Sequence, residues 1–425
     1  MDSNHRRNYF VDFLAMSFGI AAWAGVTGTF LQLPQITQTA PEGENLPAYI
    51  AILTQSGNIV SLLYIIYEKW SPVRFDDANL IYLTLSIGCF AALFMAFFYD
   101  TTIYVGGIYR SIPLLVCTFM FAIVGCLSSV LFMPFMGRFR GIYLVTYMFG
   151  QGLNGLLTSV LSLIQGIGTP KCVTNTITNI TAVHYTESHF DSKIYFLLIF
   201  ALLLFSSFAF FLLNTMETCK SEYASIETNQ KEIETNTVNG KANDYQAIPT
   251  NTFSLTSVNF YYLMITLSVI SFLTYGFFPG IMAYSCDPYG FSAYHLASTL
   301  LSIANPVACL FSLYISRPSV RDVIVLSTLT TVCIVYIFIT ALQGPTPPFH
   351  TLAFGSYLII TVWTSFTAFG ALIKLTILQL FRCHGHKTLK WAGAVIQSSS
   401  FIGAIIVFFL VNQTKLFTKS NPCQN

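Results

Sequence analysis

Long apolar runs separated by short polar segments constrain this chain more than any other feature. Eleven can be traced, near residues 9–36, 47–67, 79–99, 111–136, 142–166, 194–213, 257–284, 291–315, 322–342, 352–381 and 391–411. A helix that crosses a bilayer needs about 20 apolar residues. Only 9% of the residues are charged, against about 25% in an average soluble domain, so the chain cannot cover a water-facing surface. The sequence predicts an all-α polytopic membrane protein with 11 transmembrane helices.

The same composition excludes several classes of function. A net charge of +2 argues against a nucleic-acid partner. The string Gly150-Gln151-Gly152-Leu153-Asn154-Gly155 matches a dinucleotide fingerprint, but it lies within an apolar helix, where glycines more often let helices approach closely. No Walker loop, metalloprotease helix or nucleophile elbow is present in the sequence. We therefore expect no enzymatic activity, no catalytic residues, no cofactor and no metal.

The basic residues predict the orientation in the membrane. With the N-terminus in the cytoplasm, 14 of the 20 lysines and arginines fall in inside segments and five in outside segments, while Lys374 lies within a span. Because cytoplasmic loops carry the excess of positive charge, this topology is favoured, with an extracellular C-terminus. The glycosylation pattern at Asn179 then falls outside, as expected for a modified site.

A polar segment divides the membrane part in two. Residues 214–256 are rich in Glu, Thr, Asn and Lys, which predicts a disordered cytoplasmic linker. The predicted domains are an N-terminal bundle of six spans at 1–213, the linker, a C-terminal bundle of five spans at 257–411, and an extracellular tail at 412–425. A two-bundle layout is common in carriers that rock around a central site.

The polar groups inside the spans are mostly neutral. They are the amides of Gln32, Gln55, Asn58, Gln151, Asn154, Gln165, Asn305, Gln379 and Gln397. Such amides often only bond helix to helix, and that reading stays open for each one. Several together suggest a cavity for an uncharged solute that forms hydrogen bonds. Trp23 lies mid-span, outside the interfacial belt where Trp collects, so it either packs between helices or stacks on a planar ring.

Prolines and a lysine add to this pattern. Pro34, Pro134, Pro279 and Pro306 interrupt spans, and each frees a helix carbonyl. Such breaks commonly mark carrier binding sites, although plain kinks are about as frequent. Lys374 either reaches back to the cytoplasmic interface or lines the cavity.

Several strings resemble those of a known family. They are Phe18-Gly19 to Leu33-Pro34, Pro41-Glu42-Gly43, Pro134-Phe135-Met136, Gly150 to Leu157, Ser285-Cys286-Asp287-Pro288-Tyr289-Gly290, Ala293-Tyr294-His295-Leu296 and Ala304-Asn305-Pro306. Together they resemble the eukaryotic riboflavin transporters of the solute carrier class, over most of the membrane part. The resemblance implies import of riboflavin at the plasma membrane by alternating access, in a fold similar to equilibrative nucleoside transporters. Riboflavin and the lipid bilayer are the expected partners.

The predicted substrate site combines mid-membrane depth, polarity and these motifs. Its residues are Trp23, Asn58, Gln151, Asn154, Tyr294, Asn305, Lys374 and Gln397. Stacking aromatics and neutral amides suit a flat, neutral tricycle with a polyhydroxyl tail. A transporter of nucleosides or of another aromatic heterocycle would accept the same chemistry, and a membrane receptor without transport is a further alternative.

The cysteines suggest one disulfide. Of ten cysteines, Cys172, Cys286 and Cys423 fall in outside segments, where oxidation is favoured. The resemblance places cysteines at both 286 and 423, which implies the pair Cys286–Cys423. Cys172 stays open as a competing partner.

The titratable groups bear on the energy source. The family often has Glu at the position of Gln32, and some members have Glu at that of Gln151, but both are amides here. Amides cannot titrate. His295 is the remaining candidate within the spans, unless it only packs there. We expect transport driven by the substrate gradient, independent of sodium, with at most modest acid stimulation.

Overall fold

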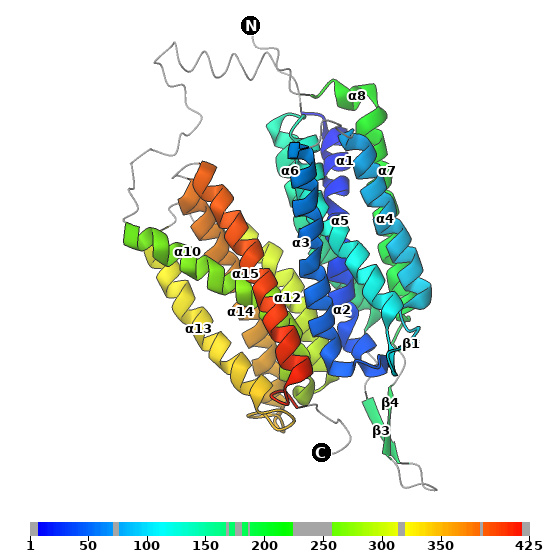
Figure 1. The fold of residues 1–425 in the computed structure, drawn as a ribbon, viewed down its shortest axis with the longest axis vertical. Coiled ribbons are helices and arrows are strands. Elements are labelled where there is room, and N and C mark those ends of the chain that lie inside the picture. Colours follow the sequence, from blue (N-terminus) through cyan, green and yellow to red (C-terminus); the bar gives the residue numbers. More distant parts are fainter. Residues whose placement is uncertain are drawn as a thin grey trace.

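The chain forms two helical bundles that stand side by side (Figure 1). A computed structural model describes residues 7–70, 76–166, 170–174, 181–185, 188–223, 257–312, 319–382 and 386–418. The N-terminal bundle contains α1 (Tyr9–Ile20), α2 (Ala24–Thr39), η1 (Gly43–Asn45), α3 (Leu46–Trp70), α4 (Asp77–Phe98), α5 (Ile112–Met136), α6 (Gly141–Gln165), α7 (Ser192–Thr215) and α8 (Glu217–Lys220). The C-terminal bundle contains α10 (Ser257–Ser271), η2 (Phe272–Phe277), α11 (Phe278–Cys286), η3 (Asp287–Tyr289), α12 (Phe291–Ser312), α13 (Val320–Leu342), α14 (Ala353–Arg382) and α15 (His386–Gln413).

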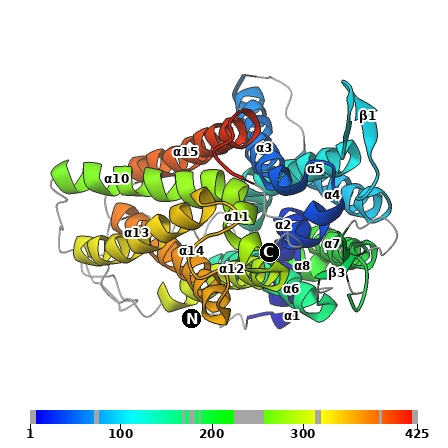
Figure 2. The ribbon, with the colours of Figure 1, turned by 90° about the horizontal axis from the view of Figure 1, so that it is seen from below.

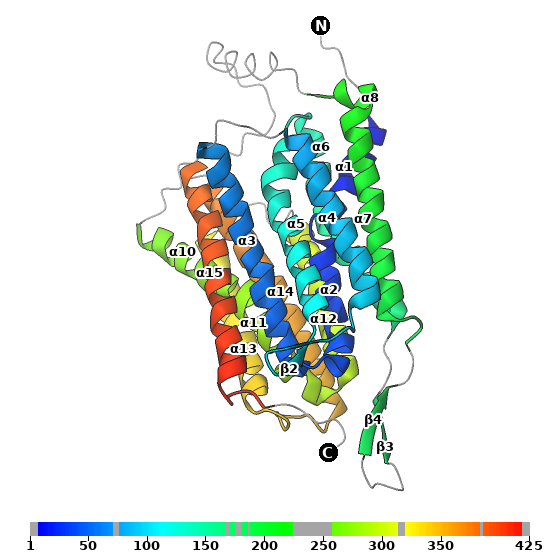
Figure 3. The ribbon, with the colours of Figure 1, turned by 45° about the vertical axis from the view of Figure 1, so that its right-hand side comes forward.

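Two β-hairpins mark one end of the molecule. The strands β1 (Ile103–Val105) and β2 (Ile108–Arg110) pair between α4 and α5, and β3 (Pro170–Thr174) pairs with β4 (Thr181–Tyr185) between α6 and α7. We call this the hairpin end, and we call the opposite end, where α1 begins and α8 lies, the α8 end (Figures 1 and 3).

Each predicted apolar run is helical over nearly all of its described residues, apart from the break at residues 21–23. Among the described residues, eight helices are long and apolar enough to cross a bilayer, or nine if the bent pair α1 and α2 counts as one span. That pair bends by 49° at residues 21–23. The helices α6 and α12 have 25 and 22 residues and fall outside this set. The sequence of α6 contains several glycines and amides, and that of α12 contains several serines together with Asn305 and Pro306. The count of 11 stays a prediction.

Aromatic clusters fill the core of each bundle. In the N-terminal bundle the ring of Phe18 on α1 lies 4.7 Å from Phe132 on α5 and 5.0 Å from Phe210 on α7. In the C-terminal bundle Phe278 on α11 lies 4.8 Å from Phe366 on α14 and 5.3 Å from Phe338 on α13. Since each ring joins three helices, the burial of these side chains stabilises the bundle as a unit.

The glycines of α6 serve close helix contacts, as the packing interpretation predicts. A Cβ atom on Gly150 would lie 2.0 Å from the carbonyl oxygen of Met16 on α1, and one on Gly155 would lie 3.1 Å from that of Ser302 on α12. Larger residues would therefore push apart α6 and its neighbours in both bundles.

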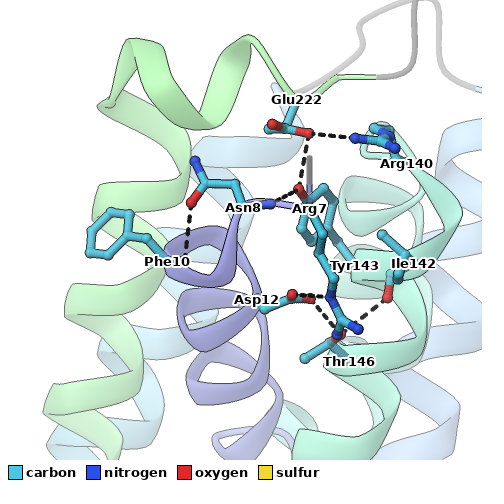
Figure 4. A network of polar contacts seen from close by, with 9 residues as sticks. All are labelled: Arg7, Asn8, Phe10, Asp12, Arg140, Ile142, Tyr143, Thr146 and Glu222. Atoms are coloured by element: carbon cyan, nitrogen blue, oxygen red, sulfur yellow. Dashed lines mark hydrogen bonds and ion pairs between the residues drawn. The ribbon is translucent and has the colours of Figure 1, made fainter. Parts of the chain in front are cut away.

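The predicted linker begins later than its composition suggests. Although 214–256 is predicted to be disordered, α7 continues to Thr215 and α8 follows. Glu222 is buried and accepts hydrogen bonds from Tyr143 Oη at 2.9 Å and Arg140 Nη1 at 3.2 Å (Figure 4). The buried carboxylate and the ring of Tyr223, 4.7 Å from Phe139, hold this segment on the N-terminal bundle. Residues 224–256 lie outside the described part of the chain.

The first helix is held by the same network. Asp12 is buried at the α8 end of α1. It forms an ion pair with Arg7 and accepts a hydrogen bond from Thr146 Oγ1 at 2.8 Å (Figure 4). The backbone N–H of Asn8 donates to Tyr143 Oη. The start of α1, the start of α6 and the segment after α7 thus share one polar cluster.

Candidate functional site

The interface between the bundles contains a helix break with a freed carbonyl. Pro279 has no N–H group, so the carbonyl of Tyr275, four residues earlier, loses its α-helical donor. The chain opens there into the π-helical turn η2. Gln55 of α3, in the other bundle, donates from Nε2 to this carbonyl at 3.1 Å. The proline therefore creates an acceptor that the opposite bundle satisfies.

Two predicted site residues lie beside this bond. Asn58 donates from Nδ2 to Gln55 Oε1 at 3.2 Å. Lys374 of α14 is 7% exposed, and its Nζ lies 3.9 Å from the centre of the Tyr275 ring. A cation over the face of an aromatic ring is attracted to it. Asn58, Gln55, Tyr275 and Lys374 form a group that we call the π-turn cluster.

A second proline, on α12, frees another carbonyl at the interface between the bundles. Pro306 removes the donor for the carbonyl of Ser302, which faces Gly155 of α6. A Cβ atom on Gly152 would lie 4.0 Å from the Pro306 side chain. Asn305, a predicted site residue, thus stands beside the part of α6 that carries Gln151, and its own side chain is exposed.

Trp23 lies at the break between α1 and α2. Its ring packs on α5, because a Cβ atom on Gly125 would lie 2.9 Å from it. One turn earlier on α5, the backbone of Ala122 lies against Gly57 of α3. A Cβ atom on Gly57 would lie 2.8 Å from the Ala122 carbonyl oxygen. Trp23 and Asn58, which follows Gly57, are therefore held by neighbouring turns of one helix.

The amides of α6 bond locally. Gln151 donates from Nε2 to Tyr147 Oη at 3.0 Å, and Asn154 donates to the carbonyl of Gln151. Thr27 of α2 donates to Asn154 Oδ1 at 3.3 Å. Asn154 is buried and Gln151 is partly exposed, so the outer side of this group can still reach a solute.

Two predicted site residues stand apart. Tyr294 is 1% exposed near the hairpin end of α12, and its hydroxyl has no hydrogen-bond partner among the described residues. Eleven residues along α12 separate it from Asn305, or about 16 Å of helix. Gln397 lies on α15 with an exposed side chain. The prediction that all eight residues line one cavity stays a prediction.

Hydrogen bonds also close a seam between the bundles toward the hairpin end. Ser162 Oγ of α6 and His295 Nε2 of α12 lie 2.8 Å apart. The hydroxyl of Tyr284 donates to the side-chain oxygen of Asn45, and Asn45 Nδ2 donates to Asn412 Oδ1 at 3.5 Å. Toward the α8 end the ribbons of the two bundles diverge (Figure 1).

Gln32 lies inside a saturated amide network. Its Nε2 donates to Gln165 Oε1 at 2.5 Å, and its Oε1 accepts from Ser192 Oγ at 2.8 Å. Gln165 in turn donates to Gln35 Oε1 at 3.0 Å and to the carbonyl of Phe190 at 3.2 Å. All of these side chains belong to the N-terminal bundle near its hairpin end, so the network stabilises that bundle.

Two further predictions rest on residues outside the described ranges. Cys286 is fully buried and has no disulfide partner among the described residues, while Cys423 lies beyond them. Asn179 also lies outside the described part of the chain, as does the side chain of Cys172. The disulfide and the glycosylation stay predictions.

Sequence reasoning missed Tyr275 and Tyr147 and left Gln55 outside the site. Tyr147 could have been found, because it precedes Gln151 by four residues and so lies on the same helix face. Gln55 and Tyr275 meet only because two helices from different bundles cross at a proline break. No spacing of residues along the sequence predicts that contact.

The comparisons with known proteins agree on one family. The family model "Solute carrier family 52, riboflavin transporter" matches residues 7–419. The chain belongs to this family. A riboflavin transporter, member 3-B, of Danio rerio is 31% identical over 97% of this chain and 98% of its own length. The riboflavin transporter rft-1 of Caenorhabditis elegans is also 31% identical, with the same coverage.

Solved structures show the same kind of fold. The POT family transporter PepTSo has a TM-score of 0.57 at 10% identity, over 96% of this chain and 90% of that one. The D-xylose-proton symporter has a TM-score of 0.56 at 11% identity, over 95% and 90%. A structure of the nucleoside transporter NupG reaches 0.50 at 11% identity, over 96% and 91%. The predicted family, an all-α transporter fold and a transporter in place of an enzyme are thereby confirmed.

Proposed function

We propose that the chain imports riboflavin across the plasma membrane by alternating access between its two bundles. Membership of the riboflavin transporter family over residues 7–419 is the observation that carries the proposal. The chemistry of the interface supports it independently. Aromatic faces, amide groups and the Ser302 carbonyl freed by Pro306 can bind a flat heterocycle with carbonyl, N–H and hydroxyl groups.

In this proposal the π-turn cluster and the amides of α6 hold the substrate. Lys374 and Asn58 donate to ring carbonyls, Trp23 offers a stacking face, and Gln151, Asn154 and Asn305 bind the polyhydroxyl tail. Tyr294 and Gln397 complete the predicted set at greater distance. The freed carbonyl of Ser302 adds an acceptor for a substrate N–H or hydroxyl.

The proposed topology puts the α8 end in the cytoplasm and the hairpin end outside. The distribution of lysine and arginine supports it. The domains are then 1–213, 257–411 and the extracellular tail 412–425, with the linker on the cytoplasmic side. Because hydrogen bonds close the seam toward the hairpin end, we assign the arrangement to the inward-facing state.

Uptake measurements test the function directly. Cells that express the chain should accumulate radiolabelled riboflavin faster than control cells, and unlabelled riboflavin should compete. Labelled nucleosides serve as the second substrate class. Nucleoside uptake without riboflavin uptake would support the alternative carrier, and surface expression with neither flux would support a receptor.

A further inference from the structure

The connection between α4 and α5 is an apolar hairpin that contains none of the residues of the proposed substrate site. Its strands pair Tyr104 with Tyr109 and Val105 with Ile108, and Gly106 and Gly107 turn the chain with φ of +63° and +89°. Five large side chains are exposed: Ile103 by 44%, Tyr104 by 62%, Val105 by 49%, Ile108 by 51% and Tyr109 by 62%. No charged residue lies between Ile103 and Tyr109. Water on both faces of such a hairpin is unfavourable.

The hairpin extends sideways from the molecule. Seen from the hairpin end, it reaches out beyond the rim of the N-terminal bundle (Figure 2). Seen from the side, β2 lies at the level where the helices end, in contrast to β3 and β4, which point away from the bundles (Figure 3). Arg110 at its base donates from Nη1 to Tyr49 Oη of α3 at 3.1 Å, which fixes the hairpin in this direction.

Neighbouring side chains indicate the depth of the hairpin relative to the bilayer. Phe97 and Phe98, at the end of the apolar helix α4, are 52% and 40% exposed. Lys193 Nζ lies 4.8 Å from the centre of the Phe97 ring. A lysine beside the last apolar turns of a span places its ammonium group at the level of the lipid headgroups. The hairpin starts five residues after Phe98 and continues the same apolar surface.

The two faces of the hairpin differ in chemistry. The register puts Tyr104 and Tyr109 on one face, with their rings 5.2 Å apart, and Ile103, Val105 and Ile108 on the other. Arg110, the partner of Ile103 at the base, shares this second face, and its guanidinium group is held there by Tyr49. Tyrosine prefers the boundary between headgroups and acyl chains, whereas Ile and Val prefer the acyl chains.

We propose that this hairpin lies in the outer leaflet, parallel to the membrane, as an anchor that binds lipid at the boundary between headgroups and acyl chains. The aliphatic face turns toward the acyl chains and the tyrosine face toward the headgroups. Arg110 then joins this lipid-bound hairpin to Tyr49 in the first turn of α3. Asn45, which takes part in the closed seam, directly precedes α3.

Fluorescence quenching by lipids tests the proposal. We would place single tryptophans with Ile108→Trp and Tyr109→Trp in the full chain, in nanodiscs that hold one copy, and subtract the signal of the four native tryptophans. Phe97→Trp on α4 and Thr346→Trp, at an exposed position between α13 and α14, calibrate lipid and water. Acyl chains brominated near the headgroup should remove most of the added intensity at both hairpin positions, more at 108 than at 109, while aqueous iodide has little effect.

The opposite pattern would overturn the proposal. If iodide quenched both hairpin positions as strongly as position 346 and brominated lipid did not, the hairpin would lie in water. If iodide quenched them in single-copy discs but not in discs that hold two copies, a second copy of the chain would be the partner.

Discussion

At the scale of single residues, Lys374 is the most unusual member of the interface. Burying an ammonium group is costly unless something compensates its charge. The Tyr275 ring, at 3.9 Å, does this in part, and a π face compensates less than a carboxylate would. The pair leaves the cation available to a substrate carbonyl.

We expect Lys374→Met to raise the KM for riboflavin. The loss of one hydrogen bond to substrate costs about 1–3 kcal/mol, or roughly 5- to 150-fold in affinity. Lys193→Met is the matched control, because Lys193 also lies over an aromatic ring, Phe97, but away from the interface. Uptake kinetics of the two variants at equal surface expression would measure the difference, and an unchanged KM in Lys374→Met would remove Lys374 from the site.

The proposed disulfide also belongs to this scale. Cys286 is fully buried, so a thiol there reacts only if its partner is already beside it. If Cys286 and Cys423 are paired, Cys423→Ser should expose one new thiol to maleimide after denaturation without reductant. Cys172→Ser should expose none. A gain in Cys172→Ser instead would assign the competing partner.

At the scale of elements, the proline breaks explain what the sequence could and could not predict. Pro279 and Pro306 could be identified as breaks from the sequence, and their freed carbonyls follow from the missing N–H. That Gln55 would satisfy the first and Gly155 would face the second depends on how α3 and α6 cross the other bundle. Helix boundaries were predicted from hydropathy. The short helix α8 was missed because its one buried apolar residue, Cys219, lies within a polar segment.

The break at Pro279 gives a double-mutant test. Gln55→Ala should leave the Tyr275 carbonyl without its donor and destabilise the protein by about 1–3 kcal/mol. In a Pro279→Ala background the restored N–H can satisfy that carbonyl, so the same change should cost less. Melting temperatures of the four proteins in detergent would measure the coupling. Equal shifts in both backgrounds would mean that Gln55 acts independently of the break.

At the scale of the whole molecule, most of the described polar contacts between the two bundles join amides, hydroxyls and carbonyls, and Lys374 beside Tyr275 is the charged exception at their interface. This composition bears on the driving force. We expect liposomes that contain the chain to equilibrate riboflavin without concentrating it, whether or not a pH gradient is imposed. Accumulation that collapses with a protonophore would contradict this expectation and point to His295 or Asp12.

A substitution extends the same test. Gln32→Glu places a titratable group among Gln165 and Ser192, where a protonated carboxyl can still donate but a carboxylate cannot. Uptake by this variant should therefore increase as the pH falls, measured against the nearly flat profile expected for the parent chain.

The orientation of the molecule has its own test. With the hairpin end outside, Asn179 is accessible to the glycosylation machinery. Protein from eukaryotic cells should run faster on a gel after glycosidase treatment, and Asn179→Gln should abolish that shift. Asn412-Gln413-Thr414 is a second match to the acceptor pattern. Asn412→Gln should not abolish the shift, because Asn412 lies at the very end of α15, where the bilayer is expected to be too close for modification. A shift that survives in Asn179→Gln would contradict the assignment.

The polar cluster around Glu222 has a consequence for how far the halves can move. It holds Glu222, near the end of the described segment that follows α7, on the N-terminal bundle. The next described helix, α10, begins at Ser257 in the C-terminal bundle. The 33 residues from 224 to 256 could reach roughly 110 Å if fully extended. A connection of this length is long enough that we expect it to set no limit on the rocking motion proposed above. In the proposed mechanism the range of motion is then limited by the hydrogen bonds of the seam between the bundles.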